Sequence, residues 1–488
     1  MIADGSSRRL NEYKSLSKMS ETRYTLSRGE KCLIAKAQDS EDRKISEDCV
    51  IDVFPPYAHH GCHQLVFVEV AEQLADSKAE QRTSLKVIGV LDPSEDILEQ
   101  FAARSQWFLP ALLENTSDHP NLHIIISGKS GGEHARLVYD NLVHPYLSAL
   151  GLKENADYAV QETMSAATIS TFTKSTLLPR AQSGIHQSVI LLSGDGGVVD
   201  LVNGLLTHGT PTEGYVKPQI AILPMGTGNA LAHSTLVTSD QTLGLSTVAR
   251  GRPKALPTFR AHFSPGARVI EGGEALPEPA DSRVVAAVAD DDGLIVYGAV
   301  VFSYGLHASL VGDSDTPEYR KHGAQRFQMA AENLLHPPNG EPPHAYRAGV
   351  SVRRKGEQAW QAVEREEHAY VLATFASQLE AGFTISPASK PLDGQLRLIH
   401  FGLLEGGGDA LMEIMMKAYD GGKHATDERI EYEEIEGVKI EFDVDGGEEE
   451  EKWRRVCVDG KIFVVAKKGN VVVEKEESAV VDLVTLAR

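Results

Sequence analysis

Short apolar runs alternate with longer amphipathic segments through the first half of the chain. The apolar runs lie at residues 122–126, 158–161, 189–192 and 219–223. The amphipathic segments, at 133–150, 166–175, 198–206 and from 230, are typical of helices. Strands that alternate with helices predict a parallel sheet covered on both faces. Ligands bind to such sheets at the carboxyl ends of the strands.

The pattern changes after about residue 253. Strand-like runs follow one another at 284–288, 295–302, 370–375, 395–401, 439–442 and 462–466, and one predicted helix, at 319–335, interrupts them. Polar or proline-rich loops separate these runs. The pattern predicts a second domain that is built on a mostly antiparallel sheet.

The segment before residue 120 has a third pattern. Residues 1–30 are polar, and we expect them to be disordered. Apolar runs at 65–70 and 85–90 predict strands, and residues 93–115 have the spacing of an amphipathic helix. We therefore predict an α/β protein with a small N-terminal module of unknown role at 31–115. A parallel, doubly wound nucleotide domain follows at 120–250, and a β-rich, β-sandwich-like second domain at 251–480.

The composition narrows the possible partners. The chain has 488 residues and a formal net charge of −21, which argues against binding nucleic acid along its whole surface. The first twenty residues lack the apolar core of a secretory signal, and no stretch approaches the ~20 apolar residues of a membrane span. Four cysteines in so long a chain are typical of a reducing compartment. We therefore expect a cytoplasmic protein without a transmembrane segment.

Three glycine-rich turns follow three of the predicted strands, at 127–132, 193–197 and 224–229. Glycine lets backbone N–H groups approach a phosphate, and each turn opens a helix whose N-terminus favours an anion. A single turn of this kind fits a plain strand-to-helix connection, whereas three at one sheet edge predict a polyphosphate site. The residues that we expect at the phosphates are Ser127, Lys129, Ser130 and Gly131, then Ser193, Gly194 and Gly196, then Gly226, Thr227 and Asn229.

Asp195 stands in the second of these turns, in the sequence Ser-Gly-Asp-Gly. A carboxylate among phosphate-binding amides would repel the ligand unless the chemistry requires it. It can accept the proton of an attacking hydroxyl, or it can hold Mg²⁺. We therefore predict that Asp195 is the general base of a phosphoryl transfer, a reaction that otherwise needs mainly positioning and charge neutralisation.

Three motifs follow one another: Ser-Gly-Asp-Gly at 193–196, Val-Asn-Gly-Leu at 202–205, and Leu-Pro-Met-Gly-Thr-Gly-Asn-Ala-Leu-Ala at 223–232. In these motifs the chain resembles the catalytic domain of the diacylglycerol kinase superfamily, most closely the sphingosine kinases. The resemblance extends from about residue 122 to 466. It implies an enzyme that uses ATP and Mg²⁺ to phosphorylate a lipid hydroxyl at a membrane surface. It also implies that the second domain binds the lipid and that a cytoplasmic enzyme associates peripherally with intracellular membranes.

The resemblance assigns several residues to the nucleotide. Asp195 matches the catalytic aspartate of the family, and Thr163 matches a threonine near the nucleotide. Arg320 and Arg326 match two arginines that reach the ATP phosphates. As helix residues alone, these arginines fit surface ion pairs equally well. Asp459-Gly460 matches a turn of the second domain that returns to the active site.

Other matches concern the lipid. Asp200 falls where sphingosine kinases have a glutamate in the helix after the catalytic turn. Ser309 occupies the place of an aspartate that, in sphingosine and ceramide kinases, reads the polar head of the lipid. Asp313 and Asp315 follow in the same loop as substitutes. Because a cationic amine needs a carboxylate partner, the change at Ser309 bears on the acceptor lipid rather than on the superfamily.

Two further positions depart from the family pattern. The first glycine turn begins Ser127-Gly128 where the family has Asn-Pro, and Lys461 follows the Asp459-Gly460 turn where the family has a glutamate linked to the metal.

Several functions stay open at this point. The one we favour is a kinase of sphingoid bases, with ceramide and diacylglycerol as alternative acceptors. A relative of NAD kinase or phosphofructokinase would share the Gly-Asp-Gly turn but lacks the motif at 223–232. A catalytically weak lipid sensor on a kinase scaffold would explain the departures, although Asp195 and all three glycine turns are present.

Overall fold

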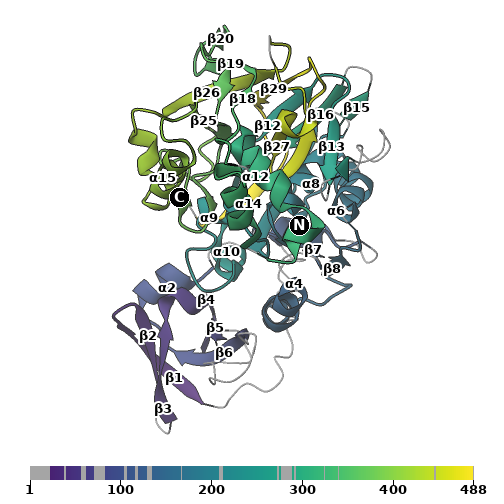
Figure 1. Cartoon of the computed structure of the whole chain (residues 1–488). Coiled ribbons are helices and arrows are strands. Elements are labelled where there is room, and N and C mark those ends of the chain that lie inside the picture. Colours follow the sequence, from purple (N-terminus) through teal and green to yellow (C-terminus); the bar gives the residue numbers. More distant parts are fainter. Residues whose placement is uncertain are drawn as a thin grey trace.

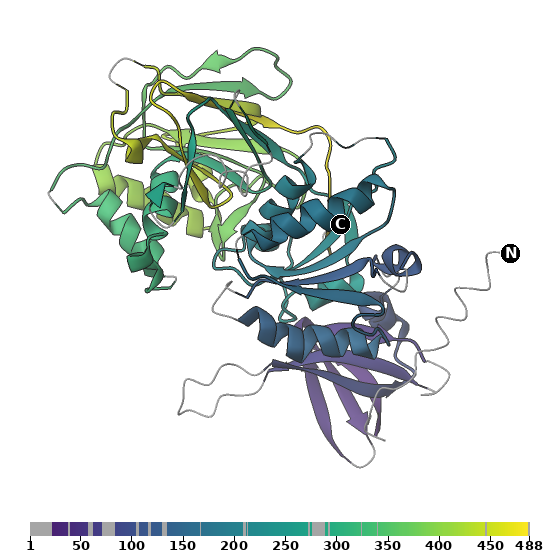
Figure 2. The same cartoon turned by 90° about the vertical axis from the view of Figure 1, so that its right-hand side faces the viewer.

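The computed structural model describes residues 22–37, 40–56, 62–70, 83–103, 107–115, 119–128, 134–165, 167–207, 211, 213–271, 274–275, 288–290, 293–323, 325–338, 340–444 and 447–486. Figures 1 and 2 show three parts in a row. The N-terminal module lies at the bottom, the nucleotide domain in the middle and the second domain at the top.

The nucleotide domain is built on a six-stranded sheet of order β11-β30-β10-β9-β7-β8. The strands are β7 (Leu122–Ile126), β8 (Tyr158–Glu162), β9 (Ser188–Ser193), β10 (Gln219–Pro224), β11 (Arg252–Ala255) and β30 (Asp482–Thr485). Five of these strands run parallel, and β11 pairs antiparallel with β30 at the edge.

Helices cover both faces of this sheet, because the side chains of each strand alternate between them. On one face Ile124 and Leu192 pack with α4, α5 and α10, and on the other Ile125 and Leu191 pack with the helices from α6 to α9. The bounds are α4 (His134–Val138), α5 (His144–Ala149), α6 (Thr168–Phe172), α7 (Leu178–Gln182), α8 (Asp195–Leu205), α9 (Ala230–Ser234) and α10 (Leu245–Arg250), with π-helical turns at 139–143 and 173–177. The predicted doubly wound α/β domain is confirmed.

The second domain is a large antiparallel sheet whose main path is β14-β13-β28-β27-β17-β22-β25-β26-β29-β12-β16-β15, with β19 and β20 attached at β26. The strands are β12 (Phe259–Phe263), β13 (Arg268–Glu271), β14 (Glu274–Ala275), β15 (Val288–Asp290), β16 (Gly293–Gly298), β17 (Val301–Gly305), β19 (Gly349–Arg354), β20 (Gln361–Ala362), β22 (Tyr370–Thr374), β25 (Leu396–Phe401), β26 (Glu431–Glu441), β27 (Arg455–Val458), β28 (Lys461–Val464) and β29 (Asn470–Lys475). Short pairs form between β18 (Tyr346–Arg347) and β21 (Glu367–His368), and between β23 (Gln378–Glu380) and β24 (Phe383–Thr384). The mostly antiparallel second domain is confirmed.

The helices of the second domain are α12 (Leu306–Ser314), α13 (Pro317–Arg320), α14 (Gln325–Leu335) and α15 (Gly407–Tyr419). The single helix predicted at 319–335 is therefore wrong. The chain breaks between α13 and α14, where Gly323 adopts a positive φ of 57° that a helix does not tolerate. The strand predicted at 284–288 lies outside the described residues except for Val288.

The chain crosses between the two domains twice. It leaves the nucleotide sheet after β11, and it returns after β29 to add β30 between β10 and β11. The predicted boundary at 251 therefore falls one strand early, because β11 still belongs to the nucleotide sheet. The last strand belongs to that sheet as well.

The N-terminal module is a six-stranded sheet of order β3-β2-β1-β6-β5-β4. Its elements are β1 (Arg23–Gly29), β2 (Cys32–Ala37), β3 (Ser40–Ser46), β4 (Val50–Phe54), β5 (His63–Val70), β6 (Thr83–Leu91), α2 (Glu95–Phe101) and α3 (Leu109–Leu113). The expectation of disorder over 1–30 fails for β1, while residues 1–21 lie outside the described residues.

The helix predicted at 93–115 is two short helices, α2 and α3. The apolar residues of this segment serve two different cores, which explains the break. Phe101 packs inside the module, whereas Trp107 and Phe108 pack with the nucleotide sheet. A single straight helix could not reach both cores.

The module is fixed to the nucleotide domain by hydrogen bonds as well as by apolar packing. The Arg250 guanidinium, at the end of α10, donates to the carbonyl oxygens of Ile51 (2.9 Å), Gln100 (2.9 Å) and Val50 (3.4 Å). Trp107 Nε1 donates to the Val248 carbonyl oxygen at 2.9 Å. Four donor–acceptor pairs thus tie one helix to the module.

We expect the substitution Arg250→Met to lower the free energy of unfolding by about 2–3 kcal/mol, because two partly buried carbonyl groups and one exposed carbonyl group lose a charged donor. Lys86→Met is the matched control, since Lys86 forms an exposed ion pair with Glu69 in the same module and should cost at most ~0.5 kcal/mol. Denaturant unfolding of the two variants measures the difference. Equal effects would contradict the docking role of Arg250.

Candidate active site

Parallel register brings the three predicted turns to one edge of the sheet. Ser127 N donates to the Leu192 carbonyl oxygen at 3.0 Å, and Met225 N donates to the Ser193 carbonyl oxygen at 3.0 Å. The strands β7, β9 and β10 therefore end side by side, as predicted from the alternating pattern. Lys129, Ser130 and Gly131 of the first turn lie outside the described residues.

The second and third turns touch through their backbones. A Cβ on Gly194 would lie 2.9 Å from the Gly226 Cα, and a Cβ on Gly226 would lie 2.7 Å from the Gly194 Cα. Asn229 closes the third turn, because its Oδ1 accepts from Gly226 N at 2.8 Å and its Nδ2 donates to the Gly226 carbonyl oxygen at 2.7 Å. Thr227 of the same turn is exposed. Only glycine permits this approach of the two turns.

Asp195 begins helix α8, and its carboxylate bridges the second turn to helix α9. Its Oδ2 accepts from Ala230 N at 2.8 Å and its Oδ1 from Leu231 N at 3.0 Å. Burial raises the pKa of Asp195 above its ordinary value of 3.8, and the two amides and the nearby His233 offset part of that rise. Each carboxylate oxygen keeps a further lone pair, so the group can still accept a proton.

A pocket of about 210 Å³ lies beside Asp195. Its lining consists of Ser127, Thr163, Ser165, Ile169, Ser193, Gly194, Gly196, Gly197 and Asp200. Hydroxyl groups and glycine backbone dominate, and no basic side chain is among the described residues that line it. Gly196 has nothing within 4 Å of an ideal Cβ position, so its backbone faces open space. The pocket therefore offers amides and hydroxyls, the groups that surround phosphates.

Thr163 lies at the start of the first turn. Its Oγ1 accepts from Gly128 N at 3.2 Å, and its own N donates to the Ile126 carbonyl oxygen at 2.9 Å. Thr163 thus fixes the start of the turn and lines the pocket.

Asp200, one and a half turns into α8, forms an ion pair with Lys461 of the second domain. Lys461 is the first residue of β28 and follows the Asp459-Gly460 turn. The sequence marked both positions but gave no reason to pair them, since 261 residues separate them.

Asp459 is held by three consecutive backbone amides. Its carboxylate accepts from Ala299 N (2.6 Å), Val300 N (3.0 Å) and Val301 N (2.6 Å). Burial raises the pKa of Asp459 to about 7; the amides lower it, and the negative charge of Asp195 adds to the rise. Asp459 therefore lies within electrostatic range of Asp195, although the two belong to different domains.

Strand β23 of the second domain also contacts helix α9. Ser234 Oγ donates to the Gln378 carbonyl oxygen and accepts from Gln378 N, both at 3.1 Å, and the Leu379 carbonyl oxygen lies 3.2 Å from a Cβ built on Gly228. His233, beside Asp195 and Glu380, has its pKa lowered by burial, while those two carboxylates offset part of the shift. Sequence reasoning missed Ser234 and His233, because neither stands out from the motif around them.

Arg320 and Arg326 do not line the pocket. Arg320 forms two hydrogen bonds with the Asp315 carboxylate, at 3.1 and 2.8 Å, and Arg326 lies 3.6 Å from the same group. Arg326 also stacks over the Phe327 ring at 4.7 Å. Both arginines thus form ion pairs with the same carboxylate, that of Asp315 in the second domain.

Two of the residues expected at the lipid, Ser309 and Asp313, lie on helix α12 and not in the loop that the sequence predicted. Ser309 is buried, with 1% of its surface exposed. Asp313 accepts a hydrogen bond from Arg455 at 2.8 Å. Neither lines the pocket beside Asp195.

The described residues contain no group of three or more histidine, cysteine or acidic side chains arranged to hold a metal. Both oxygens of Asp459 are occupied by amides, and Asp200 is paired with Lys461. Asp195, which lies between the lining residues Gly194 and Gly196 in the chain, is the remaining carboxylate of this region. Mg²⁺ commonly binds through one or two carboxylates plus substrate phosphates, and the residues present fit that arrangement rather than a cage made by the protein.

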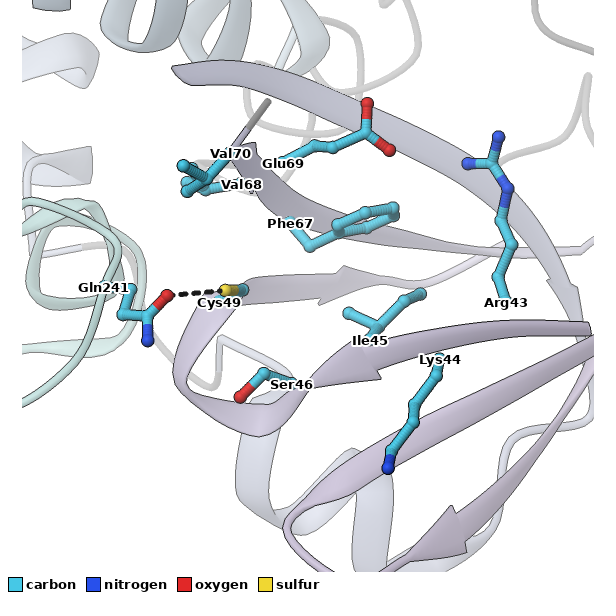
Figure 3. A pocket seen from close by; sticks show the side chains of 10 residues that line it. All are labelled: Arg43, Lys44, Ile45, Ser46, Cys49, Phe67, Val68, Glu69, Val70 and Gln241. Atoms are coloured by element: carbon cyan, nitrogen blue, oxygen red, sulfur yellow. Dashed lines mark hydrogen bonds between the residues drawn. The ribbon is translucent and has the colours of Figure 1, made fainter. Parts of the chain in front are cut away.

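A second cavity, of about 360 Å³, lies on the N-terminal module and is drawn in Figure 3. Cys49 and Gln241 meet at its wall, where the Cys49 Sγ donates to the Gln241 Oε1 at 3.4 Å. The cavity contains no residue of the three glycine turns. It is separate from the chemistry around Asp195.

The middle domain is similar in sequence to domains of known proteins. Residues 121–261 match the diacylglycerol kinase catalytic domain family. "Sphingoid long-chain bases kinase 1" of Arabidopsis thaliana is 27% identical over 154 residues, which are 32% of this chain and 19% of that protein. The chain thus spans about a fifth of the length of the curated relative it matches. The match to the diacylglycerol kinase catalytic domain family is thus confined to residues 121–261.

Two solved structures are similar in outline. A putative diacylglycerol kinase from Bacillus anthracis has a TM-score of 0.47 and 17% identity, over 75% of this chain and 97% of that one. Yeast NADH kinase complexed with NADH has a TM-score of 0.34 and 10% identity, over 75% of this chain and 84% of that one. At TM-scores below 0.5 these similarities carry no functional argument.

We expect Gly226→Ala to lower the free energy of unfolding by about 1–3 kcal/mol, because the new methyl group meets the Gly194 backbone. Gly196→Ala is the matched control. Its methyl group meets no atom within 4 Å, and alanine is favoured over glycine in a helix, so stability should not fall. Denaturant unfolding measures both. An unchanged midpoint for Gly226→Ala would mean that the two turns are not in contact.

Proposed function

We propose that the protein transfers the γ-phosphate of ATP to a hydroxyl group of a lipid. The observation that carries this proposal is the carboxylate of Asp195, whose chain neighbours Gly194 and Gly196 line a pocket made of hydroxyls and glycine backbone. The match of residues 121–261 to the diacylglycerol kinase catalytic domain family supports it.

Asp195 acts as the general base. The amides of Ala230 and Leu231 orient its carboxylate, and its raised pKa makes it a better proton acceptor than an ordinary aspartate. The acceptor hydroxyl gives its proton to Asp195 as its oxygen bonds to the γ-phosphorus and ADP leaves. The positive end of the α8 dipole, at Asp195, favours the negative charge of the phosphates.

Mg²⁺ would enter with the ATP phosphates, with Asp195 as the carboxylate within reach, and would neutralise their charge when bound. The amides and hydroxyls of the pocket would hold the phosphate oxygens. The expected contacts that line the pocket are Ser127, Thr163, Ser193, Gly194 and Gly196. The further positions that the turns or the resemblance indicate are Gly226, Thr227, Asn229, Lys129, Ser130, Gly131, Arg320, Arg326, Asp459 and Gly460.

A sphingoid long-chain base is the acceptor that the name of the Arabidopsis thaliana relative suggests. One observation favours a neutral acceptor such as ceramide or diacylglycerol instead. Two of the carboxylates expected near the lipid, Asp200 and Asp313, each pair with a basic residue of the protein, Lys461 and Arg455. An ammonium group of a sphingoid base would have to compete with these partners.

We place the reaction at a membrane surface, because the acceptor is a lipid. Among the described residues, no helix is long and apolar enough to cross a membrane. A cytoplasmic protein that associates peripherally with intracellular membranes fits the proposed reaction.

Incubation of the purified protein with labelled ATP and vesicles that contain one lipid at a time tests the proposal. We expect wild type to label one acceptor class, and Asp195→Asn to lower kcat by about 10²–10⁴-fold while ATP affinity stays within about threefold. Binding of ATP without labelling of any lipid would support the sensor alternative. Loss of ATP binding in Asp195→Asn, with normal turnover at saturation, would contradict the role of Asp195 as the base.

The pH dependence of kcat gives an independent test. Asp195 must be deprotonated to act, so its raised pKa moves the loss of activity on acidification to a pH above the 3.8 of an ordinary aspartate. We expect kcat to rise with pH through the raised pKa and then to level off. A rate that stays constant down to pH 4 would exclude Asp195 as the group that titrates.

A further inference from the structure

The described residues of the pocket beside Asp195 supply no positive side chain, and Lys129, two residues after the lining residue Ser127, lies outside the described residues. Phosphoryl transfer needs positive charge near the phosphates. The described residues that line the pocket include no basic side chain, and their one charged side chain, Asp200, is negative. An unpartnered carboxylate at that place would repel a polyphosphate.

Among the described residues, Lys461 forms an ion pair with Asp200, a residue that lines the pocket. Its Nζ pairs with Asp200 Oδ1, and the two side chains are only 22% and 17% exposed, so solvent screens the pair less than a surface ion pair. Arg320 and Arg326, two other candidate cations, are both held by Asp315 and do not line the pocket.

The backbone at Lys461 is held firmly. It follows the turn in which the Asp459 carboxylate accepts from three amides, at Ala299, Val300 and Val301. Lys461 then pairs with Val458 across the hairpin of β27 and β28. The position of its Cα relative to the pocket is therefore set by the second domain, while the long side chain can still change partners.

We propose that Lys461 is a phosphate-binding residue of this pocket, and that Asp200 holds its ammonium group in place until a nucleoside triphosphate enters. The terminal phosphate then replaces Asp200 as the partner of Nζ, because it carries more negative charge than a carboxylate and offers several oxygens. Lys461 thereby brings positive charge from the second domain to the phosphates. This inference rests on the proposed function for the identity of the ligand.

The two members of the pair are expected to have opposite effects on nucleotide affinity. Lys461 binds the phosphate, whereas Asp200 competes with the phosphate for Lys461, so removal of Asp200 relieves that competition. A purely structural ion pair between the domains predicts the same effect from either substitution. The signs of the two effects on ATP affinity therefore distinguish a phosphate-binding Lys461 from a purely structural ion pair.

The test is equilibrium binding of ATP and of adenosine to the full chain, measured by calorimetry for wild type, Lys461→Met, Lys461→Arg and Asp200→Asn. We expect Lys461→Met to weaken ATP binding roughly 10- to 100-fold, the range for loss of one charged hydrogen bond, and to leave adenosine binding unchanged. Lys461→Arg should retain most of the ATP affinity. Asp200→Asn should tighten ATP binding, by about threefold or more.

Lys467→Met is the matched control, because Lys467 pairs with Glu449 at an exposed site of the same domain, and it should leave ATP binding unchanged. If Lys461→Met does not fold, the sign of the Asp200→Asn effect still decides. Equal losses of ATP affinity in Lys461→Met and Asp200→Asn, or no change in either, would overturn the inference.

Failure of the inference and failure of the proposed function are distinguishable. A protein that phosphorylates a lipid but binds ATP equally well with Lys461→Met keeps the function and loses the inference. A protein that labels no lipid but shows the opposite effects of Lys461 and Asp200 keeps the inference and loses the kinase proposal. Absence of ATP binding to wild type would overturn both.

Discussion

The site depends on the contact between the turns after β9 and β10. Gly194 and Gly226 approach so closely that neither position has room for a Cβ, and the Asp195 carboxylate then reaches the first two amides of α9. The contact fixes three things at once: the start of α8, the start of α9 and the direction of the carboxylate. Helices α8 and α9 pack against the second domain, so the placement of the second domain also depends on these two turns.

Carboxylates of both domains lie at the site, and only one of them, Asp200, forms an ion pair with a described basic residue. The negative charge of Asp195 adds to the raised pKa of Asp459 across the domain boundary, while Asp200 is compensated by Lys461. Such an arrangement costs stability in the empty protein and favours the arrival of cations with the substrate. Backbone amides stabilise Asp195 and Asp459 in the meantime, two for the first and three for the second.

The nucleotide domain was predictable from the sequence because its strands are buried on both faces and its turns consist of glycine. The alternation of apolar runs at 122–223 predicted the parallel sheet and the edge that the three turns share. The motif around Asp195 indicated the candidate base. Helix breaks were less predictable. The 93–115 segment divides its apolar residues between two cores, and the 319–335 segment turns at Gly323, and neither effect alters the local periodicity.

Long-range ion pairs could not be predicted from the sequence at all. The family pattern marked Asp200 and Lys461 separately, and only the fold of the second domain brings β28 to α8. Arg320 and Arg326 illustrate the opposite case, since a helix pattern allows both a phosphate contact and the partnership with Asp315. Charge partners are decided by tertiary packing, which hydrophobic periodicity does not encode.

The return of β30 to the nucleotide sheet has a consequence for how the protein is made. This strand lies between β10 and β11, more than 250 residues after β10 along the chain. A ribosome therefore releases β7, β8, β9 and β10 long before their neighbour exists, and the edge of β10 stays open while the whole second domain is synthesised. The nascent nucleotide domain has an unpaired strand edge during that interval, a surface that chaperones protect and that aggregation exploits.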